Sequence, residues 1–249
     1  MIQVKHVSKS FKDTEVLHGV DLTIREGETL VVIGGSGSGK STLLRLMIGL
    51  IRSTSGEIWV EGEEITRMDE RELDRVRLKM GMVFQYSALF DSMTVGDNVA
   101  FGLREHTDKD EEEISRIVKD KLHLVGLDGV EDKMPSELSG GMKKRVSLAR
   151  AIAIEPSIVF YDEPSSGLDP ITADKIDELI IHTQQKLNVT SVVVTHDMES
   201  ACKIADRIAM IQAGDIIALG TPEEFIASSD PRVRAFFRGV SKNSQEVLR

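Results

Sequence analysis

The chain has 249 residues, of which 41% are hydrophobic and 29% charged, and its formal net charge is −10. This length and composition fit one folded domain with a subdomain and exclude a disordered or fibrous protein. The negative charge argues against nucleic acid as a partner, and the single cysteine excludes an internal disulfide. No apolar run approaches the roughly 20 residues of a membrane span, so we expect a soluble, cytoplasmic protein.

The first third of the chain alternates strands and helices. Residues 2–7 and 20–26 alternate apolar and polar side chains as half-buried strands do, and residues 28–33 predict a buried strand. The elements expected next are a helix over 40–49, a strand and turn over 55–62, a helix over 70–79 and a short strand over 82–84.

The character of the chain changes after Gln85. Helical patterns cover 97–104, 110–125 and 141–154, and no strand signal appears between about 86 and 157. Strands and helices then alternate again: strand 158–161, helix 172–187, strand 191–195, a helix from Met198, strands 206–212 and 215–219, and helix starts at Thr221 and Asp230.

This order of elements predicts an α/β fold. We expect a mostly parallel sheet, a smaller antiparallel β subdomain at the N-terminus and an inserted α-helical subdomain. A single domain would cover residues 1–237, with its core at about 1–86 and 157–225 and the helical subdomain at about 87–156. Residues 238–249 are polar and predict a flexible tail.

Residues 34–42 match the phosphate-loop pattern G-x-x-x-x-G-K-[ST] between an apolar strand and an amphipathic helix. Glycines let main-chain N–H groups surround phosphates, while Lys40 can reach the β and γ phosphates and the Ser41 hydroxyl can bind Mg²⁺. A flexible Gly/Ser linker, the alternative, does not explain why Lys-Ser-Thr runs directly into a helix. The predicted nucleotide-binding residues are Gly34, Gly35, Ser36, Gly37, Ser38, Gly39, Lys40, Ser41 and Thr42.

Two carboxylates follow the apolar strand at 158–161. At the carboxyl end of a parallel strand they would lie beside the phosphate loop. Asp162 would then hold Mg²⁺, directly or through water, and Glu163 would polarise the attacking water as general base. The alternative is an ordinary strand-ending turn before Pro164.

A Ser-Gly-Gly sequence at 139–141 precedes the helix expected at 141–154. Exposed N–H groups and a hydroxyl at a helix start can bind an anion, although Ser139 could also be a simple N-cap. Basic residues in a first turn are unfavourable by roughly 0.3–1 kcal/mol each. We therefore expect an anion or an acidic partner to neutralise Lys143, Lys144 and Arg145.

Taken together, these motifs resemble the ATP-binding subunits of ABC transporters. The resemblance covers residues 2 to about 225 and rests on motifs that stand in the family's order: the phosphate loop, Gln85, Leu138–Met142, Asp162-Glu163, Ser166–Asp169 and His196. It implies the ABC ATPase form of the P-loop NTPase fold, with Mg²⁺-dependent hydrolysis of ATP.

The resemblance also implies roles for single residues. Phe11 would stack on adenine, Gln85 would sense Mg²⁺ and the γ-phosphate, and His196 would contact the γ-phosphate and position the water. Ser166 and Asp169 stand in the segment that signals across the dimer. Alternatively, Phe11 is an ordinary hairpin aromatic, Gln85 is a polar strand end and His196 is a structural histidine.

In this family two subunits meet head to tail, so a second copy of the chain is an implied partner. The segment Leu138, Ser139, Gly140, Gly141 and Met142 of one subunit would cap the γ-phosphate bound by the other. Met142 replaces the family's usual glutamine and cannot donate a hydrogen bond. Because Ser139 and the two glycines remain, we expect activity to survive.

Within the family the chain looks like the Mla-type branch, which moves phospholipids between the inner and outer membranes. That likeness rests on residues 139–145 with Ala149-Arg150-Ala151, on 84–95 and on 230–239. It implies a peripheral protein on the cytoplasmic face of the inner membrane, held by a multi-span permease. The permease would dock in an apolar groove near residues 86–104, with Tyr86 and Phe90 as groove residues; the alternative is that the apolar side chains of this segment pack the helical subdomain, and we expect both uses. A lipid-binding substrate protein and a small regulatory subunit are further implied partners.

Two other functions stay open. One is the ATPase of an importer for a polar solute such as an amino acid. The other is a soluble ABC ATPase without a transport role, which is disfavoured because such chains usually carry two cassettes or long coiled coils.

Overall fold

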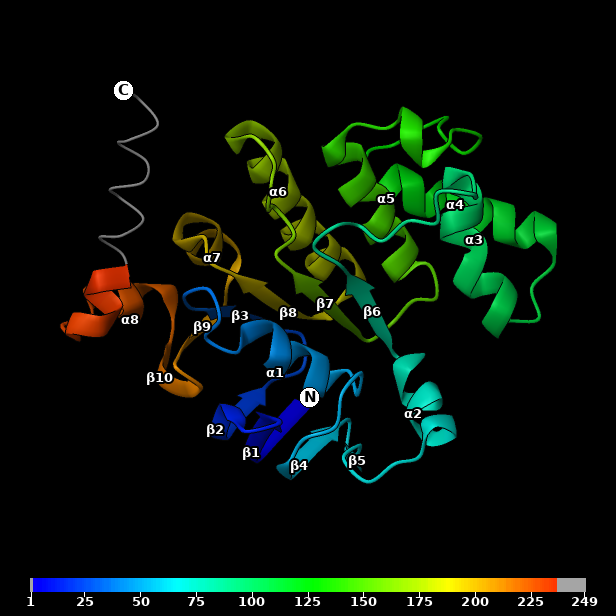
Figure 1. Ribbon diagram of the computed structural model, residues 1–249. Coiled ribbons are helices and arrows are strands. Elements are labelled where there is room, and N and C mark those ends of the chain that lie inside the picture. The colour runs from blue at the N-terminus through cyan, green and yellow to red at the C-terminus, as the bar shows by residue number, and fades with distance from the viewer. Residues whose placement is uncertain (1, 237–249) are drawn as a thin grey trace. The chain divides into compact units, whose positions relative to one another are not determined.

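The computed structural model describes residues 2–236, and the chain separates into two compact units. The first unit comprises residues 1–73 and 192–249 as far as they are described, and the second comprises residues 74–191. Figure 1 follows the chain through its helices and strands. The predicted tail at 238–249 lies outside the described residues.

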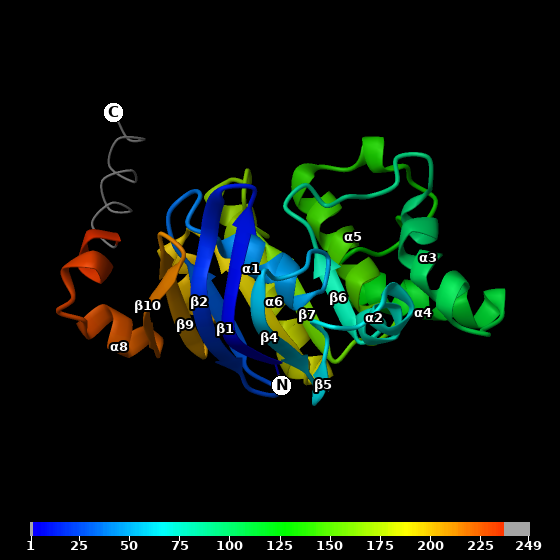
Figure 2. The same cartoon turned by 60° about the horizontal axis from the view of Figure 1, so that its bottom comes forward.

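An antiparallel sheet occupies the N-terminal part of the first unit, as predicted (Figure 2). Its strands are β1 (Ile2–Phe11), β2 (Thr14–Ile24), β4 (Ser55–Val60) and β5 (Glu63–Glu64), in the order β2-β1-β4-β5. β1 extends beyond the predicted end at residue 7, and β2 begins before the predicted start at residue 20. The pairing register shifts around His6 and Gly19, both at positive φ (49° and 66°), which interrupts the alternation that marks a strand.

The first unit also contains the strand that leads into the phosphate loop. β3 (Thr29–Ile33) is buried along its whole length and pairs in parallel with β9 (Arg207–Gln212), which pairs antiparallel with β10 (Asp215–Gly220). Its helices are α1 (Lys40–Met47), α7 (Met198–Ile204) and α8 (Pro222–Ala227), and residues 231–236 are also helical. The predicted helix start at Thr221 is confirmed by its reciprocal capping bonds with Glu224.

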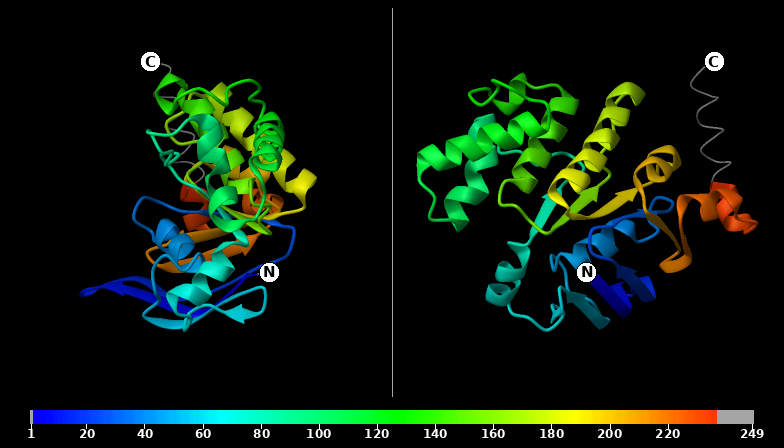
Figure 3. Two further views of the ribbon diagram at one scale, coloured as in Figure 1. Left: turned by 90° about the vertical axis from the view of Figure 1, so that its right-hand side faces the viewer. Right: turned by 180° about the vertical axis from the view of Figure 1, so that it is seen from behind.

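The second unit contains the predicted helical segments. Helices α3 (Val95–His106), α4 (Glu111–Leu124) and α5 (Gly140–Ile152) pack against one another and appear in green in Figure 3. A 3₁₀ turn, η1 (Pro135–Glu137), precedes α5, and α6 (Pro170–Leu187) closes the unit. Strands β6 (Met80–Val83) and β7 (Ile158–Asp162) pair in parallel. Two elements, α2 (Glu70–Arg77) and β8 (Thr190–Thr195), run across the boundary between the units.

Candidate nucleotide site

The phosphate loop connects β3 to α1 in the first unit. Its start packs tightly, because a β-carbon on Gly34 would lie 2.2 Å from the main-chain oxygen of Ile211. A β-carbon on Gly35 or Gly37 would meet nothing within 4 Å. The loop therefore has a closed base against β9 and an open face over Gly35 and Gly37.

Polar groups gather along this loop. Lys40 Nζ donates to the main-chain oxygens of Gly34 at 2.8 Å and Gly35 at 3.0 Å. Gly39 precedes α1 with a φ of 109° and, as a glycine, has no side chain to cap the helix. Among the described residues, the buried Oγ of Ser38 has no hydrogen-bond partner. A buried hydroxyl, an ammonium and the main-chain N–H groups of a glycine loop at a helix start fit a phosphate chain.

Two further predicted residues lie in the first unit. Phe11 ends β1 with 47% of its surface exposed, and Lys9 Nζ lies 4.7 Å from the centre of its ring. An exposed ring that a cation already contacts is suited to stacking on a base. His196 follows β8 with its side chain exposed, and Asp197 then caps α7 by accepting from two main-chain N–H groups.

The paired carboxylates lie in the second unit, where β7 ends. Asp162 is the last residue of the strand and is only 6% exposed. Glu163 follows with a φ of 49°, a left-handed conformation that is strained for a residue with a β-carbon. Ser166 N donates to Glu163 O at 3.2 Å and so stabilises the turn. Backbone strain held in place at a carboxylate is typical of functional sites.

Gln85 is joined to this strand end through a buried lysine. Lys144 Nζ donates to the main-chain oxygen of Gln85 and, at 3.4 Å, to that of Glu163. Burial lowers the pKa of the Lys144 ammonium, while the negative charges of Glu163 and Asp162 act in the opposite direction. Sequence reasoning missed this role for Lys144; the only signal was an unfavourable positive charge at a helix start.

The Ser-Gly-Gly segment begins α5. Ser139 Oγ accepts a hydrogen bond from Met142 N at 3.3 Å, so Ser139 is the N-cap of its own helix. A β-carbon on Gly141 would lie 2.6 Å from Cγ2 of Thr172, which shows how closely α5 approaches α6. Of the three basic residues expected to face an anion or an acidic partner, Lys144 and Arg145 instead donate to main-chain oxygens within the unit.

Asp169 is the N-cap of α6. Its Oδ1 accepts from Thr172 N at 3.0 Å, and hydrogen bonds from the side chain and main chain of Thr172 hold the pKa of the carboxyl below its ordinary value. Ser166, the other residue predicted to signal across a dimer, is half-buried before it. Both residues therefore lie in the turn that connects Glu163 to α6.

A patch of exposed aromatic side chains lies in the segment expected to meet a permease. Tyr86 is 87% exposed and Phe90 is 42% exposed, so both side chains are accessible. Two further aromatic side chains that the sequence did not single out, Phe84 and Phe101, are also exposed, at 38% and 37%. The rings of Phe90 and Phe101 lie 4.9 Å apart, so two of the four form a contiguous apolar surface.

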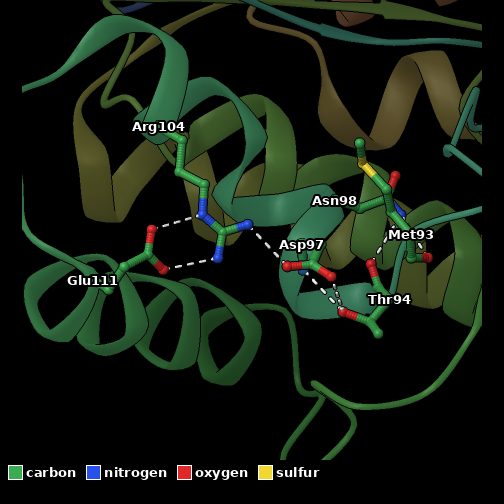
Figure 4. A network of polar contacts seen from close by, with 6 residues as sticks. All are labelled: Met93, Thr94, Asp97, Asn98, Arg104 and Glu111. Atoms are coloured by element: carbon green, nitrogen blue, oxygen red, sulfur yellow. Dashed lines mark hydrogen bonds and ion pairs between the residues drawn. The ribbon is translucent and has the colours of Figure 1, made fainter.

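A polar network joins α3 to the segment that precedes it and to α4 (Figure 4). Asn98 donates to the main-chain oxygens of Phe90, Met93 and Thr94. Arg104 joins Asp97 at 2.8 Å and Glu111 at 2.8 Å, which links α3 to α4. These bonds lower the pKa of both carboxyls.

The predicted metal ligands supply oxygen donors only. Ser41 lies in the first unit, and Gln85 and Asp162 lie in the second. A hydroxyl, an amide oxygen and a carboxylate are the hard donors that Mg²⁺ prefers, so this set fits the ion. Separately, no helix within residues 2–236 is long and apolar enough to cross a membrane.

A phosphate loop between a buried strand and a helix, with paired carboxylates ending another strand, defines a P-loop nucleoside triphosphatase. The family model for ABC transporters matches residues 17–166. The chain belongs to the ABC transporter family, as an ATP-hydrolysing subunit.

Two relatives and one solved structure illustrate the likeness. The chain is 44% identical to the intermembrane phospholipid transport system ATP-binding protein MlaF of Haemophilus influenzae, over 97% of this chain and 91% of that protein. It is 42% identical to the probable ribonucleotide transport ATP-binding protein mkl of Mycobacterium leprae, over 96% of this chain and 69% of the relative. A dimeric ATP-binding cassette in a post-hydrolysis state, bound to ADP and Pi, has a TM-score of 0.83 and 33% identity, over 89% of this chain and 99% of its own. These matches confirm the predicted ABC ATPase fold.

Proposed function

We propose that this chain powers phospholipid transport between the inner and outer membranes as the ATPase subunit of an Mla-type transporter. The observation that carries the proposal is the 44% identity, over 97% of the chain, with a protein named for intermembrane phospholipid transport. The predicted Mla-like segments at 84–95 and 139–145 contain the exposed Tyr86 and Phe90 and the start of α5, which are the surfaces that would meet partners.

The nucleotide would bind along the open face of the phosphate loop. Residues 34–42 surround the phosphates with N–H groups, and Lys40 turns from its carbonyl partners toward the β and γ phosphates. Phe11 stacks on the adenine. Ser41, Asp162 and Gln85 would hold Mg²⁺, which neutralises developing charge on the phosphates.

Hydrolysis would use residues from both units. Glu163 accepts a proton from the attacking water, His196 positions that water against the γ-phosphate, and Gln85 reports the presence of the phosphate. The strained turn of Glu163 would hold its carboxylate in one orientation. These assignments need the strand ends and the phosphate loop to meet when ATP is bound.

Each site would be completed by a second copy of the chain. Ser139, Gly140 and Gly141 of one subunit, between Leu138 and Met142, would cap the γ-phosphate held by the other, and Ser166 and Asp169 would signal between the two sites. The likeness to a dimeric cassette, at a TM-score of 0.83, supports pairing of two copies, which we propose to be head to tail. ATP then forms part of the interface, and its hydrolysis opens the dimer.

The aromatic patch would receive a cytoplasmic helix of a multi-span permease, because exposed apolar grooves suit amphipathic helices. The chain would thereby be held as a peripheral protein on the cytoplasmic face of the inner membrane. A lipid-binding substrate protein and a small regulatory subunit complete the proposed complex. We retain one ATPase domain over residues 1–237, with its core at about 1–86 and 157–225 and a helical subdomain at about 87–156.

The test is purification of the native complex from membranes, with its subunits and bound lipids identified by mass spectrometry. We expect a permease, a lipid-binding protein and phospholipid, and ATP-dependent lipid release that stops in the Lys40→Ala complex. A complex that carries a solute receptor and ribonucleotide or amino acid would contradict the lipid assignment and leave the ATPase assignment intact. Purification without any permease would favour an ATPase outside transport.

A further inference from the structure

Helix α5 carries two basic side chains that donate to the main chain of residues 85–88. Lys144 donates to Gln85 O. Arg150 donates through Nη1 to Ala88 O at 2.7 Å and through Nη2 to Ser87 O at 3.0 Å. Three carbonyl oxygens within four residues of chain are therefore bound by cations from one helix, and we name this arrangement the α5 clamp.

The clamped segment has an unusual backbone. Ser87 and Ala88 follow one another with φ values of 62° and 47°, both in the left-handed region. Each such residue costs energy when it carries a β-carbon, so consecutive ones persist only where the surroundings hold them. The two guanidinium bonds add to the main-chain bonds from Ser87 N to Phe84 O at 3.0 Å and from Ala88 N to Tyr86 O at 2.7 Å, and together these bonds restrain the segment. The segment also carries Tyr86, the most exposed residue of the aromatic patch.

The clamp reaches the end of β7 through the same lysine. Lys144 is 6% exposed, and its second bond goes to Glu163 O at 3.4 Å. A buried ammonium is unfavourable unless it is hydrogen-bonded, so the position of Lys144 depends on both carbonyls. A displacement of residues 85–88 would move this ammonium and with it the peptide of Glu163.

We propose that Lys144 is a positioning residue, which together with Arg150 ties the aromatic docking segment to α5 and sets the orientation of Glu163. The inference rests on the proposed role of Glu163 as general base. Through the α5 clamp, docking of a partner at Tyr86 and Phe90 would change the position of the Glu163 carboxylate. Lys144 itself touches neither ATP nor the attacking water.

The test compares Lys144→Met with Lys144→Arg in the full chain, measuring kcat and KM for ATP. Loss of the ammonium should lower kcat on the order of tenfold to a hundredfold, as misplacement of a catalytic group does. KM should change by less than about twofold, because the nucleotide contacts remain. Lys144→Arg should recover part of kcat, since a guanidinium can still donate to two carbonyl oxygens.

The matched control is Lys121, another buried lysine of the same unit. It is 8% exposed, and its ammonium pairs with the side chain of Glu155 at 3.0 Å. Lys121→Met should leave kcat near the wild-type value even if it lowers stability. An equal loss of kcat in both methionine variants would overturn the proposal.

A second comparison separates positioning from general damage. Because Lys144 acts through Glu163, Lys144→Met should cause no further loss of turnover in a Glu163→Gln background; a fully additive loss would contradict the clamp. If Lys144→Met does not fold, Arg150→Lys keeps the charge but replaces the two spaced nitrogen donors of a planar guanidinium by a single ammonium, and it should lower kcat at constant KM. Wild-type kcat in Arg150→Lys would overturn the clamp, whereas an active Glu163→Gln would overturn the proposed role of Glu163 as general base instead.

Discussion

The main-chain oxygen of Ile211 lies directly behind Gly34, only 2.2 Å from the point that a β-carbon on Gly34 would occupy. The same β-carbon would lie 2.7 Å from Oγ of Ser38. The phosphate loop is thus fixed from behind by β9 and folded upon itself at its first residue. Glycine is required at position 34 for space.

This packing predicts that Gly34→Ala destabilises the protein by roughly 1–3 kcal/mol, as overpacking at a rigid site does. Gly35 is the matched control, because a β-carbon there meets nothing within 4 Å. Gly35→Ala should therefore unfold at nearly the wild-type urea concentration. Equal urea midpoints of unfolding for Gly34→Ala and the wild type would contradict this prediction and show that β9 moves to make room for the methyl group.

Glu163→Gln should separate binding from hydrolysis. The amide keeps the shape of the side chain but cannot accept a proton, so single-turnover hydrolysis should slow by about 10²–10⁴. The ATP dissociation constant should stay near that of the wild type, and the dimer should persist in ATP when followed by light scattering. Normal turnover in this variant would eliminate Glu163 as the base.

Arg104 provides a pH-dependent prediction for the helical subdomain. It lowers the pKa of Asp97 and Glu111 from ordinary values of 3.8 and 4.5. Depressed carboxyl pKa values stabilise the fold above those ordinary values, and the contribution disappears as the pH falls through the folded-state pKa.

Arg104→Gln should therefore lower the urea midpoint at pH 7 and have less effect near pH 3. The loss should be small, because the side chains of Arg104, Asp97 and Glu111 are 41%, 42% and 69% exposed and water screens the charges. An equal loss at both pH values would show that the guanidinium acts through packing alone.

The exposure of Tyr86 leads to a prediction about where the permease docks. It is 87% exposed, so Tyr86→Ala should leave the stability of the chain unchanged while reducing the amount of permease that co-purifies. Ile226, which is 66% exposed in the first unit, serves as the control through Ile226→Ser. If both variants retain the permease fully, the docking surface lies elsewhere.

The parts of the fold that depend on neighbouring residues were predictable from sequence. The buried run of β3, the glycine loop and the start of α1 form one local pattern, and the Thr221–Glu224 capping box is equally local. The full length of β1 was missed because its bulges are defined by pairing with β2. Phe84 and Phe101 were missed because the exposure of an aromatic depends on what packs over it.

The partners of Lys144 show a further limit of sequence reasoning. Gln85 and Glu163 lie 59 and 19 residues away along the chain, and both accept through main-chain oxygens, which leave no mark in the sequence. Sequence patterns could therefore register an uncompensated charge at a helix start but not its partner. The N-cap at Ser139, in contrast, was already one of the two interpretations of the Ser-Gly-Gly motif.

Mixing two inactive variants tests whether the phosphate loop of one chain works with Ser139 of another. Glu163→Gln disables the carboxylate of its own subunit, and Ser139→Arg blocks the site of its neighbour. In a mixed dimer one site would combine an intact Glu163 from one chain with an intact Ser139 from the other. ATPase activity of the mixture should therefore rise above both parents, toward about a quarter of wild type for random pairing and independent sites. A mixture no more active than either parent would contradict a site shared between two chains.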